Sequence, residues 1–404
     1  MTVAEVAEMR GFRERLRWLA REKQWINDRH LEVCRIPAPT FLEQRRAQWV
    51  ASELAALGWD TRLDRAGNVV ASLYGEPARH YVALTAHLDT VLTPRDPGDV
   101  RVDPGGKFLG PGVSDNGAGL AALLAIAAAV KSSPSVPGAA ASLLLVANVG
   151  EEGEGNLNGM RHLCLHSALA GQFSAFVVLD GAATDHVTSQ ALGCRRFEVT
   201  FSGPGGHSWS DAGTANPVHA LCRAMATFSE TPLEDQPRSS VNVGLIEGGT
   251  SINSIAAGAR AKVDIRAESN QRISELVELL TQSVEQAKEQ ENSRASAGKL
   301  HVKLKEIGNR PAGQLPEGTP ILHHIRAVDA SLGIRSRKDC SSTDANIPLS
   351  LGIPAVSIGA GGLGGGAHTS QEWFSPEGRD LGLRRILMLL GHLLRDVEAG
   401  DGGR

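Results

Sequence analysis

The feature that most constrains this fold is an alternation of apolar strands and helices that stops partway along the chain and later resumes. The expected strands are 81–85, 142–149, 176–179 and 355–358. The expected helices are 3–25, 42–57, 117–130, 157–169 and 381–394. Strands this apolar are buried on both faces, which favours an α/β fold with a mostly parallel mixed sheet and helices on both faces.

A block of different texture interrupts this alternation between 190 and 307. Its strands alternate apolar and polar residues, as strands with one wet face do, and two amphipathic helices lie among them. These strands are expected at 196–202, 241–246, 259–266 and 301–307, and the helices at 217–228 and 273–290. We therefore predict an α+β domain of about four antiparallel strands and two helices at 190–307, inserted between the two parts of the α/β domain, 1–189 and 308–404.

Charge and composition exclude several classes of protein. The formal net charge of -4 shows no basic excess, so no nucleic-acid partner is expected. The longest apolar run, 120–130, is shorter than the roughly 20 residues of a membrane-spanning helix, so no membrane association is expected. The five cysteines are scattered and never spaced as C-x-x-C, which argues against a disulfide framework and a thiolate zinc site. Because residues 1–21 lack the apolar core of a signal peptide, we expect a cytoplasmic protein.

Polar residues gather where the predicted strands end. His87 and Asp89 follow the first strand and point to the same side if the segment is extended. If His87 binds a metal ion, Asp89 is placed to hold its ring, or a neighbouring ligand, in register. Asp115 precedes the helix 117–130, where it has two interpretations. It is either the N-cap of that helix or a carboxylate that bridges two cations.

An adjacent pair of acids, Glu151 and Glu152, follows the next apolar strand. Two carboxylates repel each other where water is scarce, and a nearby cation would remove that cost. One can bind the metal ion while its neighbour takes a proton from the attacking water. Asp180 follows a further strand, and a glycine-rich loop carries His368. Sites in open α/β sheets lie at the carboxyl ends of the strands, so we expect these side chains to converge.

The convergent set contains both carboxylates and imidazoles, and it suits two divalent ions about 3.5–4 Å apart that share one carboxylate. Its members are His87, Asp115, Glu152, Asp180 and His368. These ligand types favour zinc, with manganese or cobalt as alternatives. Neither a G-x-S-x-G nucleophile elbow nor an H-E-x-x-H zinc motif occurs in the sequence.

Five motifs in this order resemble the zinc metallopeptidase family of glutamate carboxypeptidase, peptidase T, aminoacylase and succinyl-diaminopimelate desuccinylase. They are H-L-D-T at 87–90, S-D-N-G-A-G at 114–119, G-E-E-G at 150–153, L-D-G at 179–181 and A-H-T at 367–369. The resemblance covers nearly the whole chain. It implies a catalytic domain of the zinc-exopeptidase type whose insert acts as a lid and dimerisation surface.

The resemblance also implies a role for each member of the convergent set. Asp115 would bridge the two metal ions, with His87 and Asp180 completing one site. Glu152 and His368 would complete the other site. One departure from the family is Gly117, where many members carry lysine. The D-N-x-x-G form is also similar to related aminopeptidases without a long lid, and the insert is what favours the first family.

Further roles are implied beyond the metal ligands. Glu151 would be the general base and Asp89 the partner of His87. In the insert, His207 matches a lid histidine that reaches the scissile carbonyl, often across the dimer, and Asn253 a polar contact to substrate. Arg310 matches an arginine that binds the substrate carboxylate, for which Arg266 is a second candidate.

We therefore expect a two-metal hydrolase that cleaves an amide bond. The leading interpretation is an exopeptidase acting on di- or tripeptides as a homodimer formed through the insert. An N-acyl-amino-acid deacylase, similar to aminoacylase or the desuccinylase, is the alternative, because the same chemistry serves both. A catalytically silent ligand-binding dimer is a more remote one, since it predicts eroded ligands that this sequence does not show.

Overall fold

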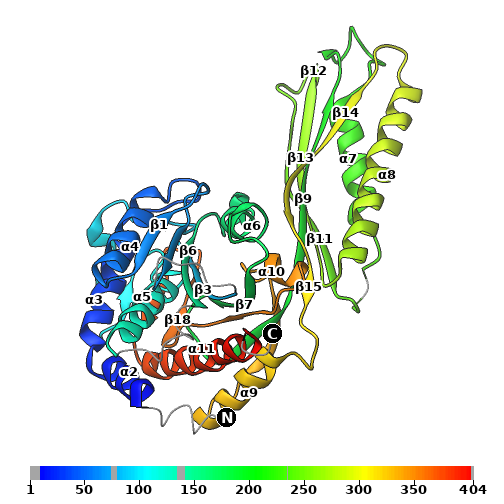
Figure 1. Cartoon of the computed structure of the whole chain (residues 1–404). Coiled ribbons are helices and arrows are strands. Elements are labelled where there is room, and N and C mark those ends of the chain that lie inside the picture. The colour runs from blue at the N-terminus through cyan, green and yellow to red at the C-terminus, as the bar shows by residue number, and fades with distance from the viewer. Residues whose placement is uncertain (1–9, 74–79, 134–141, 234, 402–404) are drawn as a thin grey trace. The chain divides into compact units, whose positions relative to one another are not determined.

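The computed structural model describes residues 10–73, 80–133, 142–233 and 235–401. The chain forms two compact units, of which unit 1 comprises Met1–Gln190 with Gln314–Arg404 and unit 2 comprises Ala191–Gly313 (Figure 1). Unit 1 has an α/β architecture and unit 2 an antiparallel sheet with two helices. The fold class expected from the sequence is confirmed.

The main sheet of unit 1 is mixed, with a parallel centre. In order across the sheet its strands are β1 (Asp60–Leu63), β2 (Val69–Ser72), β6 (Leu143–Asn148), β3 (Tyr81–His87), β7 (Phe173–Leu179), β17 (Ala355–Ile358), β8 (His186–Ala191) and β15 (Gly313–Gln314), and β16 (Arg337–Ser341) pairs with β8. Strands β6, β3, β7 and β17 run parallel to one another, whereas β1 and β2 are antiparallel to their neighbours. The carboxyl ends of the parallel strands therefore meet at one edge of the sheet.

Helices surround this sheet, some packed on its strands and others on neighbouring helices. They are α2 (Arg10–Arg21), α3 (Lys23–Cys34), α4 (Gln44–Ala56), α5 (Gly117–Lys131), α6 (Asn158–Arg161), α9 (Pro320–Leu332), α10 (Asn346–Ser350) and α11 (Arg379–Asp401). Helices α5 and α11 both pack against β3 and β7, and they contact each other. Helix α5 is buried from Gly117 to Val130, since its Ala, Gly and Leu side chains allow close approach to the sheet.

A small second sheet in unit 1 joins two segments that are distant in sequence. Its strands, in order, are β18 (Leu363–Gly365), β19 (Trp373–Ser375), β5 (Phe108–Leu109) and β4 (Arg101–Val102). Pairing of Trp373 with Leu109 and of Phe374 with Phe108 places the chain that precedes Asp115 beside the chain that follows His368.

Two helix predictions differ from the structure. The helix predicted at 157–169 is shorter and less regular than expected, because α6 continues directly into a π-helical turn, His162–His166, and helical structure ends there. Asn156 and Leu157 have left-handed backbone angles, φ 55° and 61°, so the helix begins after them, at Asn158. The helix predicted at 3–25 begins outside the described residues, and the part within them divides into α2 and α3.

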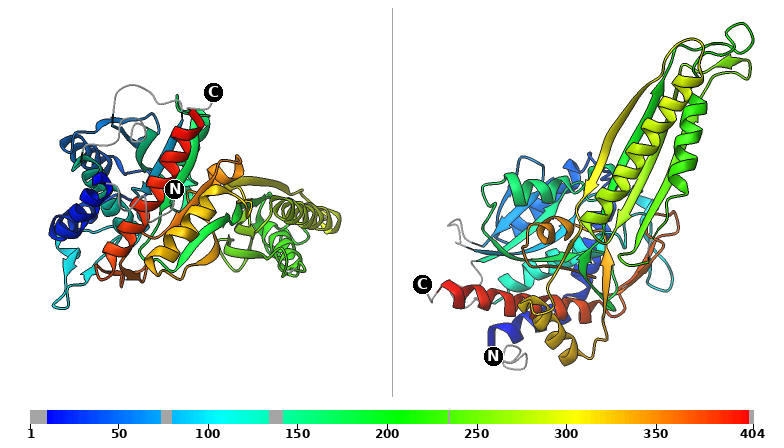
Figure 2. Two further views of the ribbon diagram at one scale, coloured as in Figure 1. Left: turned by 60° about the horizontal axis from the view of Figure 1, so that its bottom comes forward. Right: turned by 90° about the vertical axis from the view of Figure 1, so that its right-hand side faces the viewer.

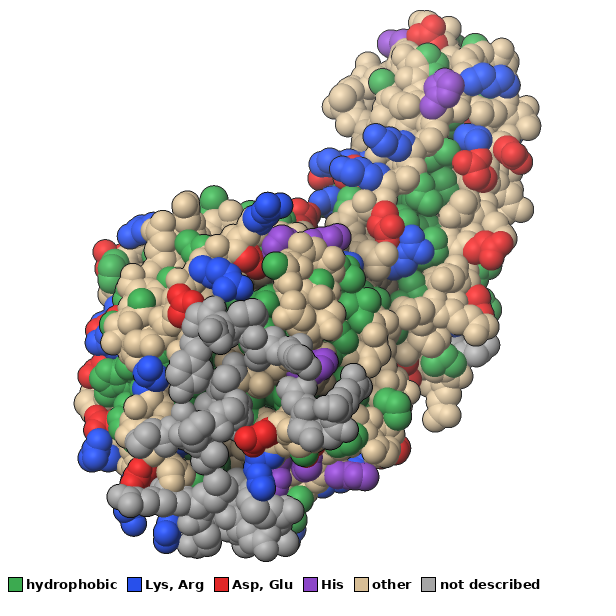
Figure 3. Space-filling model, viewed as in Figure 1, with side chains coloured by type: hydrophobic (Ala, Val, Ile, Leu, Met, Phe, Trp, Pro, Cys, Tyr) green, Lys and Arg blue, Asp and Glu red, His purple; other side chains and the backbone are tan. Residues whose placement is uncertain are grey.

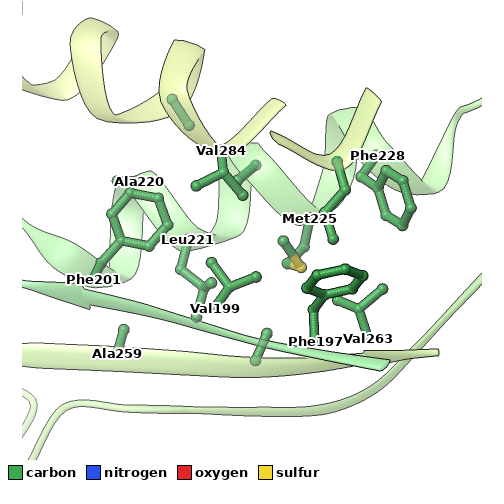
Figure 4. Packing of buried hydrophobic residues seen from close by; sticks show 14 of the residues in the cluster. Phe197, Val199, Phe201, Ala220, Leu221, Met225, Phe228, Ala259, Val263 and Val284 are labelled. Atoms are coloured by element: carbon green, nitrogen blue, oxygen red, sulfur yellow. The ribbon is translucent and has the colours of Figure 1, made fainter. Parts of the chain in front are cut away.

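Unit 2 is built on a four-stranded antiparallel sheet with both of its long helices on one face (Figure 2), and a short two-stranded sheet pairs β10 (Gly206–His207) with β12 (Ser254–Ile255). The strand order is β11 (Ser239–Gly248), β13 (Gly258–Ala267), β9 (Gly193–Ser202) and β14 (His301–Arg310), and the helices are α7 (Pro217–Ser229) and α8 (Asn270–Arg294). Along β13 every second residue is buried, as expected for a sheet with one wet face. Phe197, Val199 and Phe201 point from β9 toward Leu221 and Met225 of α7 and fill the core (Figure 4).

The surface carries both signs of charge. Lys and Arg side chains are interspersed with Asp and Glu on the face shown in Figure 3. Within the described residues, no helix combines the length and apolar character that crossing a bilayer requires.

Candidate metal centre

The side chains at the carboxyl edge of the parallel strands come together with those of two loops. They form three overlapping groups, and in each group one ligand atom per residue lies within 4.8 Å of the others. The groups are His87 with Glu151 and Glu152, His87 with Asp115 and Asp180, and Asp115 with Glu152 and His368. The structure therefore brings together all five candidate ligands and the candidate base in unit 1.

Asp115 lies at the centre of this cluster. Its Oδ1 is 3.0 Å from Nε2 of His87, and its Oδ2 is 3.0 Å from Nε2 of His368. His368 Nε2 is also 2.8 Å from Oε1 of Glu152. Because the two carboxylate oxygens face two different imidazoles, this residue can contribute one oxygen to each of two neighbouring cations.

Asp89 holds residues of the cluster in place through hydrogen bonds of its backbone carbonyl and of its side chain. Nδ1 of His87 is 2.9 Å from the carbonyl oxygen of Asp89, so Nδ1–H donates there and Nε2 turns toward Asp115. The Asp89 carboxylate is 3.7 Å from Nδ1, too far for a hydrogen bond. It accepts instead the N–H groups of Glu151 at 3.0 Å and Glu152 at 2.9 Å, and the Thr40 hydroxyl at 2.9 Å. Asp89 thus holds the ring through its backbone and the acidic pair through its side chain.

Asn116, not Asp115, is the N-cap of α5, so the capping interpretation of Asp115 is wrong. The Asn116 side chain accepts the N–H of Gly119 at 3.1 Å and that of Gly181 at 3.3 Å, and it donates to the carbonyl of Leu179 at 2.8 Å. The amide therefore satisfies the helix start and ties it to the turn that carries Asp180. The peptide bond between Asp115 and Asn116 is cis.

The departure from the family at Gly117 has a steric cause. A Cβ atom at this position would lie 2.2 Å from Sγ of Cys34 and 2.6 Å from the carbonyl oxygen of Gly112. His30 fills the same region, with Nε2 2.7 Å from the carbonyl oxygen of Val113. No side chain fits at position 117 while these groups occupy the space beside it.

The carboxylates of the cluster perturb one another strongly. Burial and the nearby negative charges of Glu151 and Asp115 raise the pKa of Glu152 to about 7. Burial and the charge of Asp115 likewise raise the pKa of Asp180 well above its usual value. Hydrogen bonds to Asp115 and Glu152 raise the pKa of His368 to about 9. The pKa of Asp115 is held low against the effect of burial by its hydrogen bonds to the two histidines. Divalent cations would relieve this crowding of acids, so the donor set fits two metal ions.

Two buried carboxylates close to the cluster were missed by sequence reasoning. Glu372 accepts the backbone N–H groups of Gly112 at 2.7 Å, Ser114 at 2.8 Å and Asp115 at 2.9 Å. Its only sequence signal is an acid four residues after His368, which resembles any loop glutamate.

The second missed carboxylate is Asp344, which is fully buried and accepts a hydrogen bond from Nδ2 of Asn148 at 2.6 Å. Burial and the charge of Glu151 raise the pKa of Asp344 to about 7. It follows no predicted strand, so no pattern in the sequence pointed to it.

The four residues expected to contact substrate all belong to unit 2. Nδ1 of the exposed His207 accepts the N–H groups of Trp209 at 3.2 Å and Ser210 at 3.3 Å. The carbonyl of Asn253 accepts the N–H of Ser208 at 3.0 Å, so Asn253 lies beside the His207 turn.

The two arginine candidates differ in their surroundings. Nε of Arg266 donates to Asp264 at 2.7 Å on the wet face of β13. Arg310 is buried at the end of β14.

Two family models match the chain. Peptidase family M28 matches residues 68–230, and the peptidase dimerisation domain, M20_dimer, matches residues 192–292. The first match spans the loops of His87, Asp115, the Glu151–Glu152 pair and Asp180, and the second spans most of unit 2.

Known proteins are similar to this chain over most of its length. The uncharacterized protein YqjE of Bacillus subtilis is 24% identical over 360 residues, which cover 85% of this chain and 91% of that protein. A tripeptidase from Staphylococcus aureus has a TM-score of 0.75 at 21% identity, covering 92% of this chain and 99% of that chain. The aminopeptidase PepT from Bacillus cereus has a TM-score of 0.72 at 17% identity, covering 92% and 98%. At these identities the solved structures show a shared fold. The two family models, together with the cluster of candidate ligands, support a metal-dependent peptidase related to the M20 and M28 families.

Proposed function

We propose that this chain is a two-metal exopeptidase that cleaves di- or tripeptides. The observation that carries the proposal is the position of Asp115 between the imidazoles of His87 and His368, each 3.0 Å from a different carboxylate oxygen. The adjacent acids Glu151 and Glu152 complete the cluster. The names of the tripeptidase and of PepT support a small peptide as substrate.

In this proposal two divalent ions would be held by the cluster, and Asp115 would belong to both sites. His87 and Asp180 would complete one site, and Glu152 and His368 would complete the other. Zinc suits this mixture of imidazole and carboxylate, and manganese or cobalt can replace it. When bound, the ions supply a water molecule of lowered pKa and polarise the scissile carbonyl.

Glu151 is the general base of the proposed reaction. It is buried, and its backbone N–H is anchored 3.0 Å from Asp89, so the carboxylate is presented at the cluster by a fixed turn. Glu151 takes a proton from the attacking water and later passes it to the leaving amine. Its neighbour Glu152 remains a ligand of the proposed metal site.

Unit 2 supplies the groups that recognise the substrate. Because Nδ1 of His207 accepts two backbone N–H groups, the ring proton resides on Nε2. Nε2–H can then donate to the oxyanion that develops from the scissile carbonyl. Asn253 provides a polar contact, and Arg310 or Arg266 pairs with the free carboxylate of the peptide. The dimerisation-domain match supports a homodimer formed through this unit.

The test is hydrolysis by metal-free protein before and after zinc, manganese or cobalt is added. The panel contains dipeptides, tripeptides, and N-acetyl and N-succinyl amino acids. The proposal expects metal-restored cleavage of the free peptides. Cleavage of the N-acylated compounds alone would replace the exopeptidase by a deacylase. Silence across the panel, with about two metal ions bound per chain, would overturn the hydrolase proposal.

A further inference from the structure

Two exposed apolar residues, Phe41 and Leu42, lie in a segment that hydrogen bonds hold at both ends. At each end these bonds attach the segment to the turn that carries the acidic pair. On one side, the Thr40 hydroxyl and the N–H of Glu152 both donate to Oδ2 of Asp89, each at 2.9 Å. Because they share one acceptor atom, Thr40 and the acidic turn are direct neighbours.

The second anchor is Glu43. Its Oε1 accepts the N–H of Gly150 at 3.1 Å, and Gly150 directly precedes Glu151. Glu43 itself is buried. The segment between Thr40 and Glu43 is therefore fixed at both ends beside the acidic turn, and its two apolar side chains project from it.

A second exposed apolar pair lies on the neighbouring segment. Thr90 pairs with Pro39 in a β-bridge, and the N–H of Thr90 donates to the carbonyl of Ala38 at 3.0 Å. Val91 and Leu92 follow directly. The exposed fractions are 64% for Phe41, 70% for Leu42, 47% for Val91 and 38% for Leu92. We call these four side chains the apolar rim. Exposed apolar side chains gathered at the border of a polar site are typical of ligand-binding surfaces.

The backbone of Phe41 adds an independent observation. Its φ is 74°, in the left-handed region that side chains with a Cβ atom disfavour. The turn closes with the N–H of Leu42 on the carbonyl of Pro39 at 2.8 Å, and a glycine would adopt this conformation without strain. An aromatic side chain that is both strained and exposed contributes little to the core, which indicates a role in binding.

We infer that the apolar rim is the subsite for a large apolar side chain next to the scissile bond. The inference rests on the proposed peptidase function. An extended peptide spans about 3.3–3.6 Å per residue. When the scissile carbonyl lies at the cluster, the peptide residues on either side of it therefore lie over the segments beside the acidic turn. The four side chains of the apolar rim are uncharged. Peptides with phenylalanine or leucine at that position are therefore the preferred substrate class, ahead of peptides with alanine, aspartate or lysine there.

The experiment compares zinc-loaded wild type with Phe41→Gly, Phe41→Ala and Leu42→Ala. Glycine tolerates the left-handed backbone, so Phe41→Gly separates loss of the ring from a disturbed turn. Leu351→Ala is the matched control, because Leu351 is 44% exposed in unit 1 and lies at the end of α10, away from the carboxyl edge of the sheet. The substrates are peptides that differ in one side chain on either side of the scissile bond.

The expected result is a wild-type preference for the phenylalanyl peptide over the alanyl peptide in kcat/KM. Phe41→Gly and Leu42→Ala should each reduce that ratio by roughly tenfold, the usual effect of removing apolar contact from a pocket. Metal content and the thermal unfolding midpoint are measured on the same samples. Leu351→Ala should keep the wild-type ratio.

Other outcomes would overturn the inference. An unchanged ratio in both variants, or an equal loss on every substrate, would show that the rim does not select side chains. A changed dimer mass in light scattering with an unchanged ratio would assign the rim to a subunit contact. A wild type that cleaves all peptides without preference would remove this inference alone. A wild type that binds metal and cleaves no peptide would remove the proposed function.

Discussion

The carboxylate of Glu372 accepts the backbone N–H of Asp115 at 2.9 Å, across 257 residues of sequence. The same carboxylate accepts the N–H groups of Gly112 and Ser114, and it lies four residues after His368. One buried side chain thus joins the loop that carries the central carboxylate to the loop that carries a candidate ligand. The relative position of the two candidate metal sites depends on this link.

Replacing Glu372 by glutamine should therefore weaken metal binding. The amide keeps one acceptor oxygen but points N–H donors at backbone N–H groups, which leaves buried donors unpaired. We expect a loss of roughly 10–100-fold in zinc affinity, typical for residues that orient metal ligands. Chelator competition measures this, with Glu377→Gln, an exposed acid on the same segment, as the control. Wild-type affinity in Glu372→Gln would contradict the positioning role.

Glu151→Gln should separate catalysis from metal binding. The amide preserves size but cannot accept a proton, so turnover should fall by at least about 10²–10⁴-fold. Metal content should stay near wild type, because the proposed ligands are unchanged. Glu154→Gln, an exposed acid three residues further along, is the matched control. An active Glu151→Gln protein with full metal content would exclude Glu151 as the base.

The cluster itself was predictable because parallel strands end at a common edge. His87 is the last residue of β3, and Glu152 and Asp180 come after β6 and β7; the apolar runs of all three strands were visible in the sequence. The strand predicted at 355–358 coincides with β17. The position of each side chain in the sequence, at the end of a strand, therefore indicated its position in space at this edge. Their roles as metal ligands remain proposals.

The supports of the cluster were not predictable, because they act on backbone groups rather than through a motif. Glu372 binds N–H groups more than 250 residues away, where periodicity carries no information. Asp89 makes hydrogen bonds through both its backbone carbonyl and its carboxylate, and this combination depends on the backbone conformation of one turn. One interpretation of the sequence placed the N-cap at Asp115, one residue before the actual N-cap, Asn116. Both residue types are good caps, so residue type does not distinguish the two positions.

Metal affinity should depend steeply on pH in a direction set by the raised pKa values. In the metal-free protein His368, with a pKa of about 9 against the usual 6.5, is protonated at neutral pH. Glu152, with a pKa of about 7 against 4.5, is partly protonated there. Zinc must displace these protons, so affinity should rise as pH increases from 6.5 through about 9. Each displaced proton corresponds to about tenfold per pH unit.

Titration calorimetry at pH 8, in buffers of different ionisation enthalpy, measures the proton release directly. His368→Ala should release about one proton fewer per chain than wild type. A metal affinity that is flat over this range, or that falls with increasing pH, would contradict the protonation states inferred from the geometry.

Restoring the family lysine at Gly117 should destabilise the protein. The Cβ atom would overlap Sγ of Cys34 at 2.2 Å and the Gly112 carbonyl at 2.6 Å, so even Gly117→Ala forces the loop to move. We expect a loss of about 1–3 kcal/mol in the free energy of unfolding, as overpacking usually gives. Denaturant unfolding of metal-free protein measures it, with Gly318→Ala as the control because no atom lies within 4 Å of a Cβ there. Cys34→Ala should restore part of the loss, and an undisturbed Gly117→Ala would contradict the steric account.

His207→Ala should lower kcat while metal content is retained. Losing one donor to a developing oxyanion costs about 10²–10³-fold in kcat, and His219→Ala, another exposed histidine of unit 2, is the control. Co-expression then tests whether His207 acts across the proposed dimer. In a mixed pair of Glu151→Gln and His207→Ala chains, one site combines an intact base from one chain with an intact His207 from the other. Recovered activity in the purified mixed dimer would place His207 in the partner's site, whereas continued inactivity would confine it to its own chain.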